Sequence, residues 1–426
     1  MANNDAGGAP VPGGPRAWSV WLIAVFFVVY YFSFQTGYSI VNTSVQNDVG
    51  LSIAQVGIIA AVYTWLFAIF QFLSGPLLDR IGARKVLLPA IVLVTIGVFL
   101  FAGAKSFNVL LLSQAFIALG ACAGFVGAGY VGGTWFGWAK FSFMFGLVQF
   151  SASLFSAFNQ NLLSWALTIV EWRGLFSYVG GFGVVLFVIA LLWLHDPVPV
   201  VVSGARGIGA FFISVFRSMA RVAKSPMVWV AAAFGSLSFG VMLALGVVWG
   251  PKLMMVRGLE EGIANFASSL LWLGLASGCF ITPWISDKVG RRKLPILIGM
   301  VLQVTALALL LYAPPLGAGI NMLLCFAFGF GNSVHMLAFS TAADVVEPEI
   351  IGTSAAIVNG IMFIFGGIMI SRPGLRIGLG QAEGLLPASL ELAQFAARPL
   401  IISISLALII ALFMRETHPA FTGKKV

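Results

Sequence analysis

The stretch Gly75 to Lys85 reads GPLLDRIGARK and joins one long apolar run to the next. A degenerate copy, PWISDKVGRRK, spans Pro283 to Lys293 and also lies between two apolar runs. Aligning Asp79 with Asp287 gives an offset of 287 − 79 = 208 residues, about half of the 426-residue chain. A repeat of this length is too long for a solenoid unit. The sequence therefore predicts two fused, related halves.

The composition indicates a membrane protein. Hydrophobic residues make up 60% of the chain and charged residues 9%, with a mean hydropathy of +1.02, whereas soluble domains carry about 25% charged residues. A helix that crosses the hydrocarbon core needs about 20 apolar residues. We expect an all-α membrane protein with twelve transmembrane helices, at about 18–40, 53–76, 86–104, 109–136, 141–168, 174–195, 227–254, 262–285, 294–313, 318–343, 352–372 and 396–414.

Lysine and arginine gather in the loops on one side of these predicted spans. Because cytoplasmic loops carry an excess of these residues, we expect both termini in the cytoplasm. The net charge of +9 is then a topology signal, and it predicts membrane lipid and no nucleic acid as a partner. The expected organisation is a flexible tail 1–17, a six-helix bundle 18–195, a linker 196–226, a second six-helix bundle 227–414 and a tail 415–426.

The linker contains one stretch with a clear helical pattern. Phe211 to Lys224, FFISVFRSMARVAK, alternates apolar and basic residues at helical spacing. This pattern predicts an amphipathic helix that lies on anionic headgroups between the bundles. A site for a regulatory partner is the alternative.

GPLLDRIGARK closely resembles the G-x-x-x-D-R-x-G-x-R-K pattern between helices 2 and 3 of the major facilitator superfamily. The second copy departs from this pattern at Pro283 and Lys288. Glu171 to Phe176, EWRGLF, resembles the start of helix 6 in the same carriers. The resemblance covers about 18–414. It implies two pseudo-symmetric six-helix bundles, both termini in the cytoplasm, and transport by alternating access.

The resemblance also implies a cytoplasmic gate. Asp79 would dock on the start of helix 11, which follows Glu347 and Pro348, while the arginines bridge the two bundles. Alternatively, the loop only sets the topology. The residues predicted for the gate are Gly75, Asp79, Arg80, Gly82, Arg84, Lys85, Asp287, Arg291 and Arg292.

Carriers built from two half-bundles bind their substrates near mid-membrane, between the repeats. The polar and aromatic residues predicted at that depth are Tyr31, Gln35, Tyr63, Gln149, Asn159, Trp249, Trp272, Asn332, His335 and Asn359. For each of them, a helix–helix hydrogen bond or a packed ring is the alternative role.

His335 is the only one of these candidates that titrates near neutral pH, and an ionisable group inside a span is a candidate for function. We expect it to couple transport to protons or, alternatively, to be a core histidine. No Asp, Glu, Lys or Arg lies near the middle of the spans that would form the cavity. Because sites for phosphates or dicarboxylates use Arg or Lys, a strongly anionic substrate is disfavoured.

The sequence contains no phosphate-binding loop, no nucleophile–base set and no cluster of Cys and His. We therefore expect no enzyme activity, cofactor or resident metal. The favoured function is a carrier, expected to be monomeric, in a bacterial inner membrane or a vesicle derived from it. A transport-inactive receptor or scaffold is the alternative, since the second motif is degenerate. The intact first motif disfavours that alternative.

Two further stretches suggest a cargo. Gln35 to Leu51 and Lys140 to Phe158 are similar to a magnetosome membrane carrier of this superfamily. That likeness implies iron, or an iron complex, moved into a vesicle. The lack of mid-membrane carboxylates disfavours a bare iron ion and favours a chelated form.

Overall fold

The computed structural model describes residues 13–197, 208–314 and 317–423. Within these ranges the protein is helical and has no strand. The first half contains α1 (Gly14–Val49), α2 (Ile53–Ile81), α3 (Ala83–Ala102), α4 (Phe107–Ala121), α5 (Gly124–Phe136), η1 (Trp138–Lys140), α6 (Phe141–Ala166) and α7 (Trp172–Trp193).

The linker helix α8 (Ile208–Ala223) leads into the second half. This half contains α9 (Pro226–Ala244), η2 (Leu245–Trp249), α10 (Gly250–Val256), α11 (Glu261–Val289), α12 (Lys293–Tyr312), α13 (Ala318–Asn332), η3 (Ser333–His335), α14 (Met336–Ala343), η4 (Pro348–Ile350), α15 (Ile351–Ala382), α16 (Leu390–Phe413) and α17 (Pro419–Thr422).

Eleven of the described helical segments are long and apolar enough to cross a membrane. The 29-residue α2 packs among them, so each of the twelve predicted spans corresponds to a helix. The predicted class, an all-α membrane fold, is confirmed. Large apolar side chains such as Leu192, Trp193 and Phe413 are exposed on the outer surface of the bundles, as lipid contact requires.

The first span begins earlier than expected. We predicted a flexible tail over 1–17, but α1 starts at Gly14 and has Pro15 in its first turn. Proline is favourable there because the first helical N–H groups have no partner inside the helix. Residues 1–12 of the predicted tail, 198–207 of the predicted linker and 424–426 of the C-terminal tail lie outside the described ranges.

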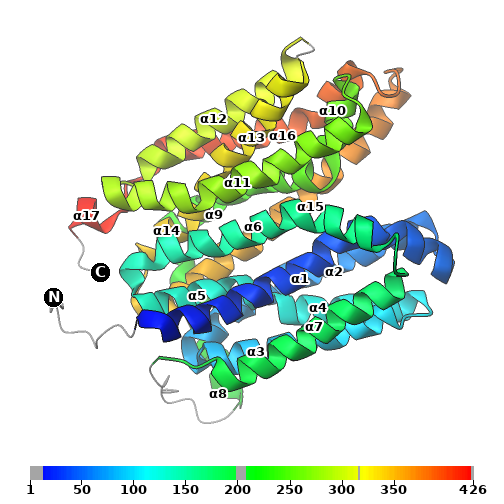
Figure 1. Ribbon diagram of the computed structural model, residues 1–426. Coiled ribbons are helices and arrows are strands. Elements are labelled where there is room, and N and C mark those ends of the chain that lie inside the picture. Colours follow the sequence, from blue (N-terminus) through cyan, green and yellow to red (C-terminus); the bar gives the residue numbers. More distant parts are fainter. Residues whose placement is uncertain (1–12, 198–207, 315–316, 424–426) are drawn as a thin grey trace.

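The first residues of α1 and the short helix α17 lie at the same end of the molecule (Figure 1). We call this end the basic end, because the two copies of the GPLLDRIGARK motif lie there. The helices α1–α7 lie on one side of Figure 1 and most of α9–α16 on the other. The halves meet along two helix pairs, α2 with α15 and α6 with α11.

Three of the spans are interrupted. Cys122 and Ala123 separate α4 from α5, the π-helical turn η2 separates α9 from α10, and the 3-10 turn η3 separates α13 from α14. Such turns inside long helices occur frequently at functional sites. The first and third interruptions lie near one repeat offset apart in the sequence, and both adjoin the cavity described below.

Arg257, which follows α10 at the end opposite the basic end, is buried. Its guanidinium donates to Asn321 Oδ1 at 2.8 Å, to the carbonyl oxygens of Leu310 at 2.9 Å and Ala313 at 3.3 Å, and to Pro314 O at 3.0 Å. These carbonyl groups lie at the C-terminal end of α12 and just after it, where the helix dipole favours a cation. Arg257 therefore fastens α10 to α12 and α13.

We predict that Arg257→Met lowers the stability of the purified protein by about 2 kcal/mol or more, because it leaves several buried carbonyls without donors. Thermal unfolding followed by circular dichroism in detergent measures this effect. Lys105→Met, at an exposed lysine of the same end, is the matched control. Equal unfolding temperatures for the two variants would contradict the role of Arg257.

Candidate substrate cavity and gate

A small cavity lies between the halves, next to the interrupted spans. Its free volume is about 10 Å³, which is room for about one water molecule. Six phenylalanines and a methionine form most of its wall, and four residues contribute polar ends. The lining residues are Tyr31, Phe32, Phe67, Phe125, Gln149, Phe239, His335, Phe339, Asn359, Met362 and Phe363.

The polar lining residues come from both halves. Gln149 on α6 donates to Ser153 Oγ at 2.8 Å. Asn359 on α15 donates to Gln71 Oε1 on α2 at 3.0 Å, and this hydrogen bond joins the two halves. Gln71 in turn donates to Ser74 Oγ at 2.8 Å. One hydrogen bond between amide side chains, from Asn359 to Gln71, therefore joins the two halves beside the cavity.

A buried network fixes His335. Its Nδ1 lies 2.7 Å from the carbonyl oxygen of Asn332. Because a carbonyl only accepts, Nδ1 must carry the proton, and Nε2 is the acceptor of the neutral ring. The ring stacks on Phe239 with centroids 4.5 Å apart. The geometry thus sets the tautomer of His335 at the edge of the cavity.

Asn332 does not line the cavity but supports this histidine. Its Nδ2 donates to the hydroxyl of Ser238 at 3.0 Å and to Gln303 Oε1 at 3.1 Å. Ser238 and Gln303 were not predicted as site residues. Their only signal was that they are polar residues inside apolar runs.

The structure separates the predicted cavity residues. Tyr31, Gln149, His335 and Asn359 line the cavity. Tyr63 lies beside it, stacks on Phe67 at 5.9 Å, and its buried hydroxyl has no partner among the described residues. The other predicted residues do not line this cavity. Gln35 is half-buried, and Asn159 donates to Ser33 O at 3.1 Å. Trp272 donates to Gly246 O at 3.0 Å, whereas Trp249 donates to Ile370 O at 2.8 Å and lines a different pocket.

Asp79 at the end of α2 crosses to the other half. Its carboxylate accepts hydrogen bonds from Gly352 N at 3.0 Å, Thr353 N at 2.7 Å and Thr353 Oγ1 at 2.6 Å. These groups form the first turn of α15, where unpaired N–H groups and the helix dipole favour an anion. The contact that the resemblance implied for Asp79 is present.

Two glycines allow the halves to touch at this end. A Cβ on Gly75 would lie 2.1 Å from the carbonyl oxygen of Gly352, so α2 and α15 meet backbone to backbone. A Cβ on Gly146 would lie 2.1 Å from the carbonyl oxygen of Cys279, so α6 and α11 meet in the same way. The basic end is therefore closed at two places, and any larger side chain would keep the helices apart.

The linker helix α8 reinforces this closure. Arg80 donates to Ser214 O at 2.5 Å and to Ser218 Oγ at 2.7 Å. Arg221 of α8 forms an ion pair with Glu347, just before α15, at 3.0 Å. Thus α8 connects α2 to the segment that leads into α15. This connection was not predicted.

Arg84 does not bridge the two halves, although we predicted that the arginines of the motif would do so. Its guanidinium donates to Leu194 O and, at 2.9 Å, to Leu191 O, both in its own half. The reason is local. Gly82 has a φ of 83°, which starts α3 directly after α2 and turns Arg84 towards the end of α7. Asp196 caps this start through Ala83 N at 2.8 Å, and Lys85 is exposed.

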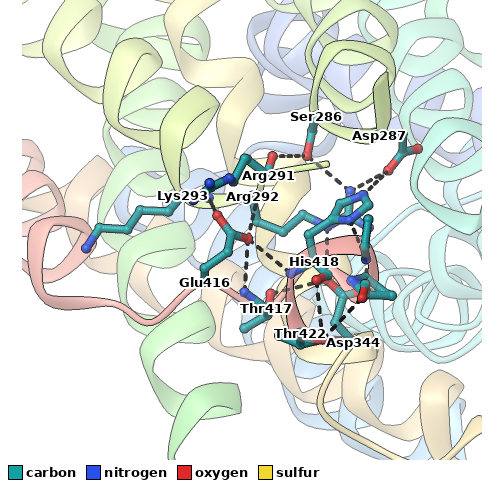
Figure 2. A network of polar contacts seen from close by, with 12 residues as sticks. Ser286, Asp287, Arg291, Arg292, Lys293, Asp344, Glu416, Thr417, His418 and Thr422 are labelled. Carbon is teal, nitrogen blue, oxygen red and sulfur yellow. Dashed lines mark hydrogen bonds and ion pairs between the residues drawn. The ribbon is translucent and has the colours of Figure 1, made fainter. Parts of the chain in front are cut away.

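The second motif closes on its own half and on the C-terminal tail (Figure 2). Arg292 pairs with Asp287 and, at 2.9 Å, with Asp344. Burial alone would lower the pKa of Arg292, but the two carboxylates outweigh it and raise this pKa. Arg291 lies over the ring of Phe421 at 4.1 Å. We expected Asp287, Arg291 and Arg292 to act in the gate, but the hydrogen bonds, ion pairs and ring contacts that they form in the described structure lie within the second half and the C-terminal tail.

Glu416 anchors the C-terminal tail to the start of α12. It accepts from Arg292 N at 2.7 Å and from Lys293 N at 3.1 Å. Burial opposes ionisation of Glu416, but the N–H groups of Arg292, His418, Lys293 and Thr417 outweigh it and lower the pKa of Glu416 below its ordinary value of 4.5. Glu416 thus caps the N-terminal end of α12, as Asp196 caps the N-terminal end of α3.

This shift predicts a pH dependence. Because the pKa of Glu416 is lower in the folded than in the unfolded protein, its stabilising contribution is present above pH 4.5 and is lost as the pH falls through the folded value. We expect the main-chain amides of Arg292 and Lys293 to be protected from hydrogen exchange at pH 7 in the wild-type protein. In Glu416→Gln, these two amides should lose their protection at pH 7. Glu383→Gln, at an exposed glutamate, is the control. Unchanged protection in Glu416→Gln would contradict the anchoring role.

Two helical halves that enclose a small, mostly aromatic cavity and meet closely at one end are typical of a membrane solute transporter. The chain belongs to the Major Facilitator Superfamily, whose family model matches residues 22–371.

Curated relatives and a solved structure agree with this assignment. The chain is 23% identical to the probable galactarate/D-glucarate transporter of Escherichia coli K12, over 82% of this chain and 84% of that protein. It is 22% identical to a D-galactonate transporter of Escherichia coli O6:H1, over 91% and 94%. The crystal structure of a variant of the Escherichia coli fucose:proton symporter superposes with a TM-score of 0.65 at 16% identity, and the match covers 92% of this chain and 99% of that one.

Proposed function

We propose that the protein carries a small hydroxylated organic acid with one carboxylate, together with a proton, by alternating access. The observation that carries this proposal is the cavity between the halves, in which His335 is the only lining residue with a basic side chain. Phenylalanine rings and amide groups form the rest of the wall.

The relatives support the chemical class of the substrate. The names of two of them include galactarate, D-glucarate and D-galactonate, which are all hydroxylated carboxylic acids. Amide and phenol groups such as those of Gln149, Asn359 and Tyr31 suit hydroxyl groups, because they both donate and accept hydrogen bonds. Aromatic faces suit the carbon skeleton of a sugar.

The number of carboxylates follows from the charges. Galactarate has two carboxylates, and recognising both would call for Arg or Lys. The cavity lining contains neither. A proton on His335 Nε2 would supply one positive charge, because Nδ1 already carries a proton. One carboxylate and one proton would therefore bind together, which would couple transport to the proton gradient.

The gate supports the alternating-access part of the proposal. In the described conformation the basic end is closed by Asp79, Gly75 and Gly146, and the cavity is too small for an organic acid. Loading must therefore follow an opening between the halves, which would break the hydrogen bond of Asn359 to Gln71. We assign the basic end to the cytoplasm on the distribution of lysine and arginine, and we place the protein in a bacterial inner membrane.

Uptake into liposomes tests the proposal. Purified protein would be offered labelled D-galactonate, galactarate, fucose and ferric citrate, with and without an inward proton gradient. We expect uptake of galactonate that the gradient drives, with weaker uptake of galactarate. His335→Gln should abolish the response to the gradient and leave galactonate exchange measurable. His195→Gln, a histidine outside the cavity, is the control. Equal responses in wild type and His335→Gln would contradict the coupling role.

Iron as cargo and a transport-inactive scaffold stay predictions. Among the described residues no group of three or more His, Cys, Asp and Glu is placed to hold a metal ion. Neither relative named above has a metal in its name. Uptake of ferric citrate alone in the same assay would favour the iron complex. Folded protein that transports none of the four solutes would favour the scaffold and contradict the carrier.

A further inference from the structure

A second and much larger pocket lies in the C-terminal half, among α10, α15 and α16. Of these, α10 lies at the end of the molecule opposite the basic end (Figure 1). Its volume is about 470 Å³, which lies within the range of small-molecule sites. The pocket lies between η2–α10, α15 and α16 and shares no lining residue with the cavity between the halves. The proposed transport function makes no use of it.

The walls of this pocket are apolar. Leu245 and Leu253 line it from η2 and α10, Ile377 from α15, and Leu392 and Leu400 from α16. Alanines at 393, 396 and 397 of α16 add little bulk, which leaves the space open. Such a wall is suited to an alkyl chain or another apolar body.

Hydrogen-bond donors lie among these walls. Lys252 is exposed, its Nζ lies 4.8 Å from the ring centroid of Trp249, and no carboxylate pairs with it among the described residues. The hydroxyl oxygen of Ser389 accepts from Leu392 N at 3.1 Å, so its proton can still be donated. The amide of Gln381 is a third donor in the lining. Together these groups suit an anionic head.

The backbone around the pocket is irregular in two places. The turn η2 is π-helical from Leu245 to Trp249. Ala388 has a φ of 57°, the only positive φ of a non-glycine residue in the described ranges. Both features cost free energy, and such features concentrate at ligand sites. The π-helical turn and the positive φ of Ala388 are observations independent of the pocket's volume, and both lie in its lining.

We propose that this pocket binds an anionic amphiphile, with its apolar chain between α10, α15 and α16 and its carboxylate or phosphate at Lys252. A free fatty acid and a membrane phospholipid share this chemistry. The cavity between the halves differs in having polar side chains from both halves among its aromatic lining residues. The pocket is therefore a second ligand site that is separate from the transport path.

Photo-crosslinking tests this site. The full-length protein in phosphatidylcholine nanodiscs would be exposed to dodecanoate carrying a diazirine near the end of its chain. In a second arm, the nanodiscs would contain diazirine-labelled phosphatidylglycerol. The uncharged alcohol of the first probe would serve as a third ligand. Mass spectrometry of peptides would locate the label. We expect it within 245–256 or 389–400, with competition by unlabelled dodecanoate.

Two variants separate the contributions of charge and space. Lys252→Gln should weaken binding of the carboxylate probe about tenfold, as expected for loss of one charge-assisted hydrogen bond. Ala396→Phe should fill the pocket and abolish labelling, and Ala393→Leu offers a milder change if the first variant folds poorly. Lys105→Gln, an exposed lysine at the same end of the other half, is the control.

The two charged probes distinguish a free fatty acid from a membrane phospholipid as the bound ligand. Labelling by dodecanoate assigns a free fatty acid, and labelling only by phosphatidylglycerol assigns a lipid. Either result supports the proposal if Lys252→Gln weakens the labelling. Equal labelling by the alcohol, labelling that survives both Lys252→Gln and Ala396→Phe, or no label in either peptide range would overturn the proposal.

Discussion

Asp79→Asn is expected to lower the rate of transport by tenfold or more while the protein still folds. The carboxylate of Asp79 accepts three hydrogen bonds from the first turn of α15, including Thr353 N at 2.7 Å. An asparagine amide has one acceptor oxygen, and its NH₂ group would face N–H donors. A loss of about 2 kcal/mol reduces the equilibrium constant for closure of the basic end by about 30-fold.

Asp287→Asn is the matched control, because Asp287 occupies the same place in the second motif but pairs with Arg292 in its own half. We expect a smaller change in rate for this variant, since its carboxylate does not cross between the halves. The measurement is the initial rate of uptake in liposomes with equal amounts of reconstituted protein. Wild-type transport by Asp79→Asn, or equal losses in both variants, would refute the gating role of Asp79.

Gly146→Leu is expected to abolish net transport by holding α6 and α11 apart. Even a Cβ at this position would lie 2.1 Å from Cys279 O, and backbone atoms cannot move aside independently of their helix. The protein would then stay open at the basic end. Spin labels at the exposed Lys140 and Lys288, near the basic ends of α6 and α11, measure the separation of these helices.

In wild type we expect a population with the short distance between these labels, and in Gly146→Leu only the longer one. The control is Gly181→Leu, since a Cβ on Gly181 meets nothing within 4 Å. A short distance in Gly146→Leu would show that the two helices can close in another way. Net uptake at the wild-type rate would contradict the requirement for backbone contact at this point.

The helices were predictable because apolar runs long enough to cross a bilayer have few alternatives. Which face of each helix is buried was not predictable. In α1 both faces are apolar, and the helix shows almost no amphipathic pattern. Where both lipid and protein are apolar, the sequence does not distinguish them. Trp249 and Trp272 were therefore placed in the substrate cavity, although both turn away from it.

The polar contacts were predictable only where a motif specified them. The contact of Asp79 with α15 followed from the resemblance of its loop to that of a known family. The buried contacts of Arg257 and Gln303 had no such signal, because their partners are far away in the sequence. The second motif has Glu416 of the C-terminal tail among its partners, and a comparison of the two motifs alone does not include this residue.

The partners of Asp79 have a consequence for genetic studies of this transporter. Two of its three donors are the main-chain amides of Gly352 and Thr353, and the third is a neutral hydroxyl. No charge reversal at a second position can therefore restore an Asp79→Lys variant. Suppressor screens should recover substitutions that favour the closed state elsewhere, and pairwise covariation across relatives should not identify a charged partner for this residue. From the α15 side, Thr353→Val would remove the hydroxyl donor, and replacement of a main-chain amide by an ester would remove one of the other two.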